Sequence, residues 1–526
     1  MYRARKYILS SLQTITTPTL EQTLSTATSS GLARIVIRAD REGRQSGSFW
    51  RAVAQRTQEI FPTLSEKELA IIVHGFGRAR IRDKALLRQV SEKISMEISR
   101  FSSGSLSSLL VSFARLEFSS EILFNAAARH LPRIAHQLTT AQTAQVFFAF
   151  SALKFRHPTL FRILGKHSVA RLVGQFEPHQ LASLLASTAV LGEASIGAVL
   201  ASEIAKQIDN FRAKHLTTIF VTYAKNQIHN PFMLELLVDQ CFRKRSEFAA
   251  SDYALVLNAI ADLKIPNAAV LVDYWLSYAG KDARKLDISS LAALAAAVSK
   301  LSKGDKAEIF VAIGNRVCEV ADTLTPRHLA TLVHAFGKVG MQHGGFLTNA
   351  PIFAARQIEK FSLDEIAMVV GGFAKLDIQD EALMIALFKT LPGRLDREQQ
   401  LLIGGGDDDL GIPVVSVVDQ ARPCAKNSLL VLLDMMGRFY ISEETPIKKI
   451  LGNISARAAE LSPSDVSRVL KAAVALQLSG PELRSLLQAK FSDDRWLETC
   501  QPQLQEQLRL QLTELGALAK QRTLDQ

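Results

Sequence analysis

The sequence predicts an all-α protein: an α-solenoid in which about twelve two-helix repeats of about 37 residues form a right-handed superhelix. Three observations favour this fold class. The chain has 526 residues, and a single hydrophobic core stops growing at roughly 250–300 residues. Ala, Leu and Ser dominate a composition that is 48% hydrophobic, which suits helices better than many short strands. A degenerate pattern also recurs at nearly constant spacing, as it does in repeat proteins.

The recurring pattern is clearest from Leu324 to Lys360. A Leu/Thr-Pro start precedes an amphipathic helix expected through Val339, and a Gly-containing turn leads into a second apolar-periodic run. We number each repeat so that the apolar residue opening its first helix is position six. A more degenerate first copy has Leu32 at this position, and the others have Leu69, Leu106, Thr143, Leu181, Leu216, Tyr253, Leu291, Leu329, Ile366, Leu429 and Val466.

The domain organisation follows from these spacings. Ile366 and Leu429 lie 63 residues apart, which is one period plus 26. The extra stretch contains GGGDDD from Gly404 to Asp409, where glycines beside like charges disfavour a helix and indicate an inserted surface loop. We therefore expect an N-terminal segment at 1–26, repeats one to ten at 27–397, the inserted loop at 398–423, repeats eleven and twelve at 424–497, and a polar cap helix at 498–526.

The N-terminal segment has the composition of a targeting sequence. Its first twenty residues contain Arg3, Arg5, Lys6, several Ser and Thr, and no acid, which is typical of a mitochondrial or plastid transit segment. An ordinary basic N-terminus is the alternative. No run of about 18 apolar residues is present, so we expect no membrane span. The mitochondrial matrix is the expected location, with the plastid as the alternative.

The first helix of each repeat has an apolar face and two small positions. Positions six, nine, ten, thirteen and sixteen are apolar in the run from Leu329 to Val339, and these steps of three and four fall on one helix face. Positions twelve and fourteen are small in most copies, for example Gly75 and Gly77, which favours close approach of a neighbouring helix. A two-helix unit cannot bury such a face alone, so the repeats must stack.

The sequence carries no sign of catalytic or metal chemistry. Gly75 to Arg78 lacks the third glycine and the preceding strand of a dinucleotide-binding loop. The three aspartates at 407–409 lack further metal ligands at set spacing, so we assign no metal. We expect no enzyme activity, no cofactor and no small-molecule substrate. No CxxC pair occurs among the cysteines, which argues against a disulfide framework or zinc module: Cys241, Cys318, Cys424 and Cys500.

A basic residue recurs at position fifteen, near the end of the first helix. Stacking turns one repeat position into one line in space, so these cations predict a basic ridge that follows a phosphate backbone. The net charge of +11 also favours an anionic partner. Alternatively, a cation in the last helical turn complements the macrodipole and caps free carbonyls without any ligand. The candidate RNA-binding residues are Arg41, Arg78, Arg115, Lys225, Lys300, Lys338, Lys375 and Arg438.

The period and the LAxLVxAFGK type of first helix resemble those of the heptatricopeptide repeat proteins. The likeness is carried by the stretches from Leu69 to Arg78, from Leu329 to Lys338 and from Ile366 to Lys375. These proteins are relatives of the octotricopeptide and FAST-kinase-like, RAP-related RNA-binding families of mitochondria and plastids. The resemblance implies an organellar α-solenoid that binds RNA. Many relatives end in a nuclease-like RAP domain, and the cap helix expected in its place favours a binding or structural role.

Two functions are compatible with these observations. The first is an RNA-binding subunit of a mitochondrial ribonucleoprotein, foremost a mitoribosomal subunit or an rRNA-binding assembly factor. Its ridge would contact the backbone of ribosomal or another organellar RNA, and its other partners would be ribonucleoprotein subunits. The second is a protein-only scaffold subunit of an organellar complex with no direct RNA contact.

Overall fold

The structure is a computed structural model that describes residues 24–301, 306–378, 380–403, 424–439, 444–478, 480–491 and 501–524. All regular elements in these ranges are helical, and the expected all-α solenoid of helix pairs is confirmed. Most of the expected N-terminal segment, and the stretch from Gly404 to Asp409, lie outside the described residues. The described chain divides into two compact units, one ending at Gln240 and the other beginning at Cys241.

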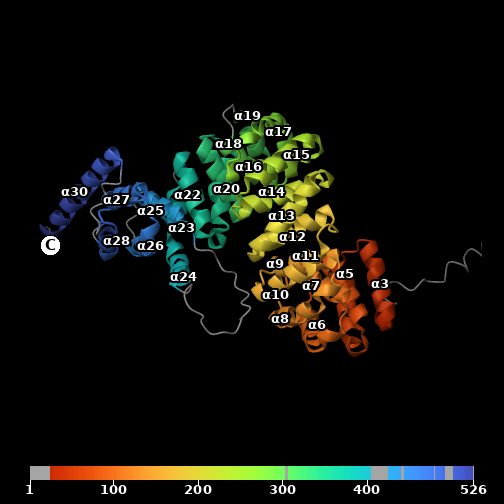
Figure 1. The fold of residues 1–526 in the computed structure, drawn as a ribbon. Helices are drawn as coiled ribbons and strands as arrows, with labels where there is room; N and C mark the ends of the chain where they lie inside the picture. Colours follow the sequence, from red (N-terminus) through yellow and green to blue (C-terminus); the bar gives the residue numbers. More distant parts are fainter. Residues whose placement is uncertain are drawn as a thin grey trace, which may run out of the picture. The chain divides into compact units, whose positions relative to one another are not determined.

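The first unit contains six helix pairs. We call the first helix of each repeat the A helix and the second the B helix. The A helices pack side by side in chain order (Figure 1). They are α3 (Ser29–Arg41), α5 (Glu66–Ala79), α7 (Ser103–Arg115), α9 (Thr140–Ala152), α12 (Pro178–Leu191) and α14 (Ala213–Lys225). The B helices are α4 (Gly47–Glu59), α6 (Lys84–Glu97), α8 (Glu121–Ile134), α10 (Pro158–Leu164) continued through a π turn by α11 (Ala170–Leu172), α13 (Ala194–Lys206) and α15 (Pro231–Arg243), whose end passes the unit boundary.

The second unit repeats this arrangement, and its last A helix packs against α30 (Pro502–Leu524), which occupies the region expected for the cap helix. Its A helices are α16 (Ala250–Leu263), α18 (Ile288–Leu301), α20 (Pro326–Val339), α22 (Leu363–Lys375), α25 (Lys426–Arg438) and α27 (Pro463–Ala475). Its B helices are α17 (Ala269–Asp282), α19 (Ala307–Glu319), α21 (Gly344–Ala355), α23 (Glu381–Lys389) followed by α24 (Leu391–Ile403), α26 (Glu444–Ala456) and α28 (Pro481–Phe491). No helix of the described chain has the length and apolar character needed to cross a membrane.

Local sequence fixes where the A helices begin. Ser65 accepts a hydrogen bond from the Glu68 N–H while the Glu68 carboxylate accepts one from the Ser65 N–H, which satisfies two free donors of the first turn. The same reciprocal cap starts α22 at Ser362. Positions six, nine, ten and thirteen then turn into the core, as the fully buried Leu69 illustrates. Positions four, eight, eleven and fifteen are left on the accessible side.

Glycines at positions twelve and fourteen allow neighbouring A helices to touch. A Cβ added at Gly75 would lie 2.4 Å from a methyl carbon of Val36 and 2.8 Å from the Trp50 ring. A Cβ added at Gly337 would lie 2.7 Å from the carbonyl oxygen of Gly372, so α20 and α22 meet backbone to backbone. The small positions seen in the sequence are therefore a packing requirement at these contacts.

We expect Gly337→Ala to lower the free energy of unfolding of the second unit by up to about 2 kcal/mol. Overpacking against backbone costs about 1–3 kcal/mol, and the better helix propensity of Ala returns about 1 kcal/mol. The matched control is Gly437→Ala at the same repeat position, because its added Cβ would be 3.5 Å from the nearest atom. That control is expected to be neutral or stabilising. Equal effects of the two changes on thermal unfolding would contradict the packing argument.

Position seventeen ends the A helices in a left-handed backbone conformation that the sequence analysis missed. Glycine is the usual residue there, because a side chain costs roughly 1–2 kcal/mol in this conformation. In this chain several copies have a residue with a long side chain there instead, for example Arg80 with φ of 55°. The described copies are Gly43, Arg80, Glu117, Lys154, Gly192, Gln227, Lys264, Gly340, Asp377 and Gln477.

The start predicted for the inserted loop at 398–423 is wrong. Residues 398–403 belong to α24, which continues as a helix to Ile403. Leu391, Leu395 and Glu398 are all buried on one face of this helix, at steps of four and three. A charged residue at the third of these positions hid the periodicity. The rest of the expected loop, residues 404–423, lies outside the described part of the chain.

Candidate nucleic-acid interface

The eight cations proposed from position fifteen occupy equivalent places in the structure. Each is the last or the next-to-last residue of an A helix, and each side chain is exposed to solvent. Arg41, Arg115, Lys225, Lys375 and Arg438 end their helices, whereas Arg78, Lys300 and Lys338 are followed by one more helical residue. The repeat register therefore places them at the loop edge of each unit, where the A helix turns toward the B helix.

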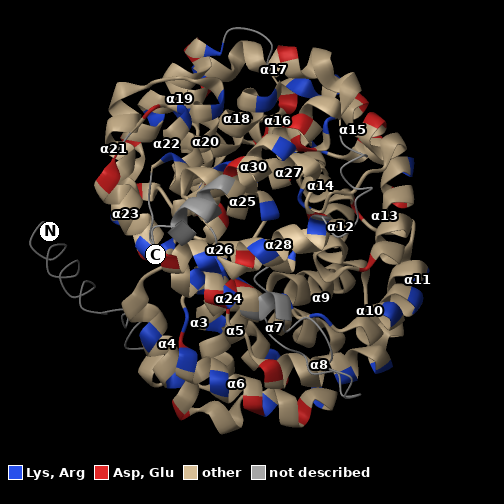
Figure 2. Ribbon diagram, turned by 90° about the vertical axis from the view of Figure 1, so that its left-hand side faces the viewer, with Lys and Arg blue, Asp and Glu red and all other residues tan. Residues whose placement is uncertain are grey.

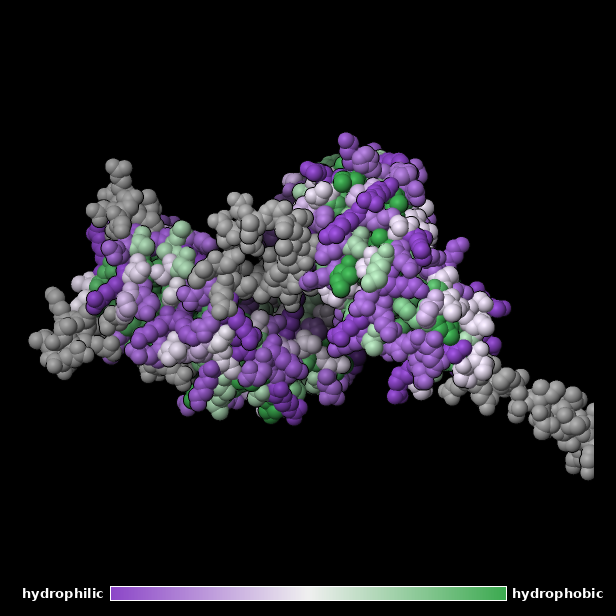
Figure 3. Space-filling view, turned by 90° about the horizontal axis from the view of Figure 1, so that it is seen from below, coloured by the Kyte–Doolittle hydropathy of each residue, from purple (hydrophilic) through white to green (hydrophobic). Residues whose placement is uncertain are grey.

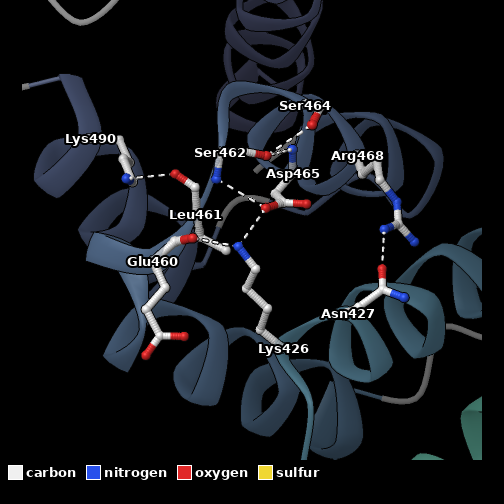
Figure 4. A network of polar contacts seen from close by, with 9 residues as sticks. All are labelled: Lys426, Asn427, Glu460, Leu461, Ser462, Ser464, Asp465, Arg468 and Lys490. Carbon is white, nitrogen blue, oxygen red and sulfur yellow. Dashed lines mark hydrogen bonds and ion pairs between the residues drawn. The ribbon is translucent and has the colours of Figure 1, made fainter. Parts of the chain in front are cut away.

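Cations of the B helices have a different, structural role. Arg394 donates to the carbonyl oxygen of Phe361, the residue at position one of the same repeat, at 2.8 Å. Lys490 makes the corresponding bond to Leu461 O at 3.0 Å, as Figure 4 shows. These bonds tie the B helix to the turn that leads into the A helix. The cations used in this way are Arg56, Lys93, Arg171, Arg316, Arg394, Arg457 and Lys490.

The position-fifteen cations do not cap helix carbonyls in the described chain. No hydrogen bond joins any of these eight side chains to a backbone carbonyl within the described ranges. The ends of α7 and α12 are instead capped from the preceding repeat, since Arg82 donates to Leu116 O at 2.6 Å and Arg156 donates to Val190 O at 3.2 Å. Lys and Arg thus occur on both the A helices and the B helices (Figure 2). Those at position fifteen make no hydrogen bond to a backbone carbonyl within the described ranges.

In the first unit the ends of α3, α5 and α7 enclose a cleft of about 870 Å³. Two acids lie among its lining residues, Asp40 and Glu117, and Trp50 and Phe148 are its aromatic members. Arginines dominate the wall and outnumber these acids by three charges. We call this site the arginine cleft; its arginines are Arg44, Arg78, Arg80, Arg82 and Arg115.

Ion pairs fix some of these arginines and leave others without a carboxylate. Arg78 Nε lies 3.0 Å from Asp40 Oδ1, and Arg82 Nη2 lies 3.6 Å from Glu117 Oε2. Arg44 Nη2 lies 3.5 Å from Glu42 Oε2, and its guanidinium sits 5.3 Å from the centre of the Phe49 ring. Within the described chain, neither Arg80 nor Arg115 forms an ion pair. The pKa of Arg115 is lowered, first by partial burial and then by the nearby Arg78. A phosphate would relieve this repulsion.

The second unit has a lysine cluster on three consecutive A helices. The pKa of Lys338 is lowered by burial and then by the charges of Lys300, Lys306 and Lys375. Lys300 forms an ion pair, in which its Nζ lies 2.5 Å from Asp262 Oδ1. His334, on the same face, has a lowered pKa because of burial and the same lysines. We call Lys300, Lys338 and Lys375 the lysine cluster.

The structure thus supports two separate groups rather than eight equal sites. Arg78 and Arg115 come together in the arginine cleft, and Arg41 lies beside it, in an adjoining hollow that it shares with Asp40. Lys225 belongs to neither group, because Ala152 and Val190 occupy position fifteen in the two preceding repeats. Arg438 Nη2 lies 3.8 Å from Asp377 Oδ1, outside the lysine cluster.

Sequence reasoning missed three arginines of the cleft. Arg80 and Arg82 come from positions seventeen and nineteen, and Arg44 comes from the loop between α3 and α4. The signal was present as the dense run of Arg78, Arg80 and Arg82. It was overlooked because only one repeat position was followed along the chain. No group of three or more His, Cys, Asp or Glu suited to a metal ion occurs among the residues that the structure describes.

Comparison with known proteins identifies one family. The sequence model described as RNA-editing substrate-binding complex 6 protein matches residues 56–195 and 233–396, more than half of the chain. These segments contain the A helices α5, α7, α9 and α12 of the first unit and α16, α18, α20 and α22 of the second. No curated protein sequence matches the chain. The resemblance to heptatricopeptide, octotricopeptide and FAST-kinase-like proteins stays a prediction.

Two structures show a distant likeness. A homology model of the full-length AP-3 complex in an intermediate open conformation is similar over 95% of this chain and 90% of that chain, with 10% identity and a TM-score of 0.34. The pentatricopeptide repeat protein PPR10 from maize is similar over 99% of this chain and 93% of that chain, with 11% identity and a TM-score of 0.26. Neither score supports an argument about function. The family match does assign the chain: it is a helical-repeat protein that belongs to the RNA-editing substrate-binding complex 6 protein family.

Proposed function

We propose that this chain is an RNA-binding subunit of a ribonucleoprotein complex and that it holds RNA by the phosphate backbone. The observation that carries this proposal is the arginine cleft, where five arginines meet two acids around a hollow of about 870 Å³. Arginine is well suited to phosphate, because its planar guanidinium forms paired hydrogen bonds and keeps its charge. The lysine cluster gives the second unit a group of cations whose charges act on one another. The proposal assigns the chain no catalytic step.

The family name supports one type of complex ahead of others. The description of the family names an RNA-editing substrate-binding complex. Our first candidate is therefore an assembly that holds RNA substrates for processing. A mitoribosomal or rRNA-assembly role is the second candidate, supported by the net charge of +11. We propose the mitochondrial matrix as the location because of the basic, acid-free N-terminal composition, with the plastid as the alternative. Purification from organelles at moderate salt, followed by identification of the bound RNA, distinguishes these complexes.

A protein-only scaffold is the alternative that one observation favours. Large apolar side chains are exposed on B helices, including Ile122 on α8, Phe232 on α15 and Val270 on α17. On the face drawn in Figure 3, hydrophobic residues form small separate patches among hydrophilic ones. Scattered exposure of this kind is common on protein surfaces. For this reason we rank the scaffold role below RNA binding.

A salt titration of the intact protein with RNA tests the proposal. Contacts to about three to six phosphates give a slope of log affinity against log salt of roughly −2 to −4 for single-stranded RNA. We expect fluorescence anisotropy with a labelled single-stranded RNA to show such a slope. Absence of RNA binding at low salt, or an affinity that does not change with salt, would contradict the proposal. Tight protein complexes formed without RNA would then favour the scaffold.

A further inference from the structure

The first unit has another hollow next to the arginine cleft, on the accessible face of its A helices. It measures about 600 Å³ and is lined by residues of α9, α12 and α14, which are consecutive A helices (Figure 1). Phe148 of α9 lines one side, and His179 of α12 and His215 of α14 also line it. Lys214 supplies a cation at the same hollow. We call this site the stacking hollow.

Phe148 connects the two sites. It is a lining residue of both the arginine cleft and the stacking hollow, and 37% of its surface is exposed. Packing does not require an aromatic side chain there, because position eleven holds Ala186 and Val221 in the next two repeats. An exposed aromatic ring at the border of a cationic cleft is the arrangement by which proteins hold a base beside its phosphate.

The histidines complete an aromatic lining. The rings of His179 and His215 have centroids 6.4 Å apart and are inclined by 42°. The pKa of His215 is lowered by burial and then by the charges of His179, Arg212 and Lys214, which favours the uncharged ring. Flat rings over a largely apolar floor that includes Ala182 and Ala186 accept a flat, weakly polar ligand.

Taking RNA binding as the function, we propose that the first unit binds single-stranded RNA, with a base stacked on Phe148 in the stacking hollow and the adjoining phosphates in the arginine cleft. Duplex RNA keeps its bases inside the helix and offers none to an aromatic side chain. A single strand can place a base and its phosphates in the two sites at once. The stacking hollow therefore determines the preference for single-stranded over duplex RNA, whereas the arginine cleft provides the affinity for phosphates.

The test compares Phe148→Ala with the intact wild-type chain. We expect the affinity for single-stranded RNA to fall roughly 5- to 100-fold, the loss associated with one stacked base, while the salt slope stays unchanged. The affinity for a duplex of the same sequence is expected to change little. A single-stranded RNA carrying 2-aminopurine should lose fluorescence on binding to wild type and keep more of it with the variant, because stacking quenches the probe.

Two further variants make the result decisive. Phe148→Trp is expected to bind single-stranded RNA at least as tightly as wild type, a result that damage to the fold would not produce. Ile122→Ala removes an exposed apolar side chain of α8 in the same unit and is expected to leave RNA binding unchanged. Wild-type affinity of Phe148→Ala for single strands, together with a steep salt slope, would overturn the stacking proposal while leaving phosphate binding intact. Loss of the salt slope in wild type would instead contradict the proposed function itself.

Discussion

Replacing Arg457 with alanine is expected to lower the free energy of unfolding of the second unit by about 3–5 kcal/mol, because it leaves the Glu398 carboxylate buried without its partner. The two side chains are only 6% and 5% exposed and form an ion pair between α24 and the end of α26. Arg457 Nη1 also donates to Cys424 O at 2.5 Å, and Glu398 Oε1 accepts from Cys424 N at 2.8 Å. These bonds join α24 and the start of α25 to the same guanidinium.

Chemical denaturation followed by circular dichroism measures this loss. The matched control is Lys449→Ala, which removes a nearby pair with Asp396 at 2.6 Å that is 30% and 50% exposed. An exposed pair contributes at most about 1 kcal/mol. Replacing both buried partners, with Glu398→Leu and Arg457→Met, is expected to recover most of the stability, since no unpaired charge remains. If Arg457→Ala and Lys449→Ala cost the same, burial of the first pair does not matter for stability.

Reversing the charges of the arginine cleft with Arg80→Glu and Arg115→Glu is expected to weaken RNA binding at least roughly 100-fold. The double change alters the local charge by four units. Each unit is worth roughly 0.7–1 kcal/mol near water, and about 1.4 kcal/mol corresponds to a tenfold change in affinity. Neither arginine has an ion-pair partner among the described residues, so the fold is expected to survive. The slope of affinity against salt should also become shallower.

The control for this reversal carries the same change of charge elsewhere in the first unit. Arg129→Glu and Arg133→Glu are exposed positions of the B helix α8 that do not line the cleft. Anisotropy titrations with the same RNA should show only a small loss for this control. Equal losses for the two double variants would show that net charge alone governs binding and that the cleft has no special role.

Periodicity predicted the architecture because every A helix buries the same apolar face. Leu329 and Phe336 lie on one helix face by spacing alone, and both are fully buried. The small residues at Gly337 and Gly372 indicated close helix contact, and the two backbones do meet there. Glu398 could not be placed in the core in this way. Its partner Arg457 lies 59 residues away, and nothing local distinguishes a paired carboxylate from a solvated one.

The candidate interface was only partly predictable for a related reason. A single repeat position located Arg78 and Arg115, but the cleft also takes side chains from two loop positions and from the turn after α3. The sequence also could not show that Asp40, 38 residues before Arg78, neutralises one of these charges while Arg115 keeps its own. Convergence of this kind depends on how the loops stack, which spacing along one position does not reveal.

The left-handed residue at position seventeen lets the charge of the loop edge vary independently of the core. The backbone there is imposed by the end of the A helix, and side chains as different as Arg80, Glu117 and Gln227 are accepted. A substitution at this position changes the charge of the loop edge without altering the core, at a cost of roughly 1–2 kcal/mol when it replaces glycine. The charge of the loop edge can therefore change one repeat at a time while the buried face of each A helix stays the same.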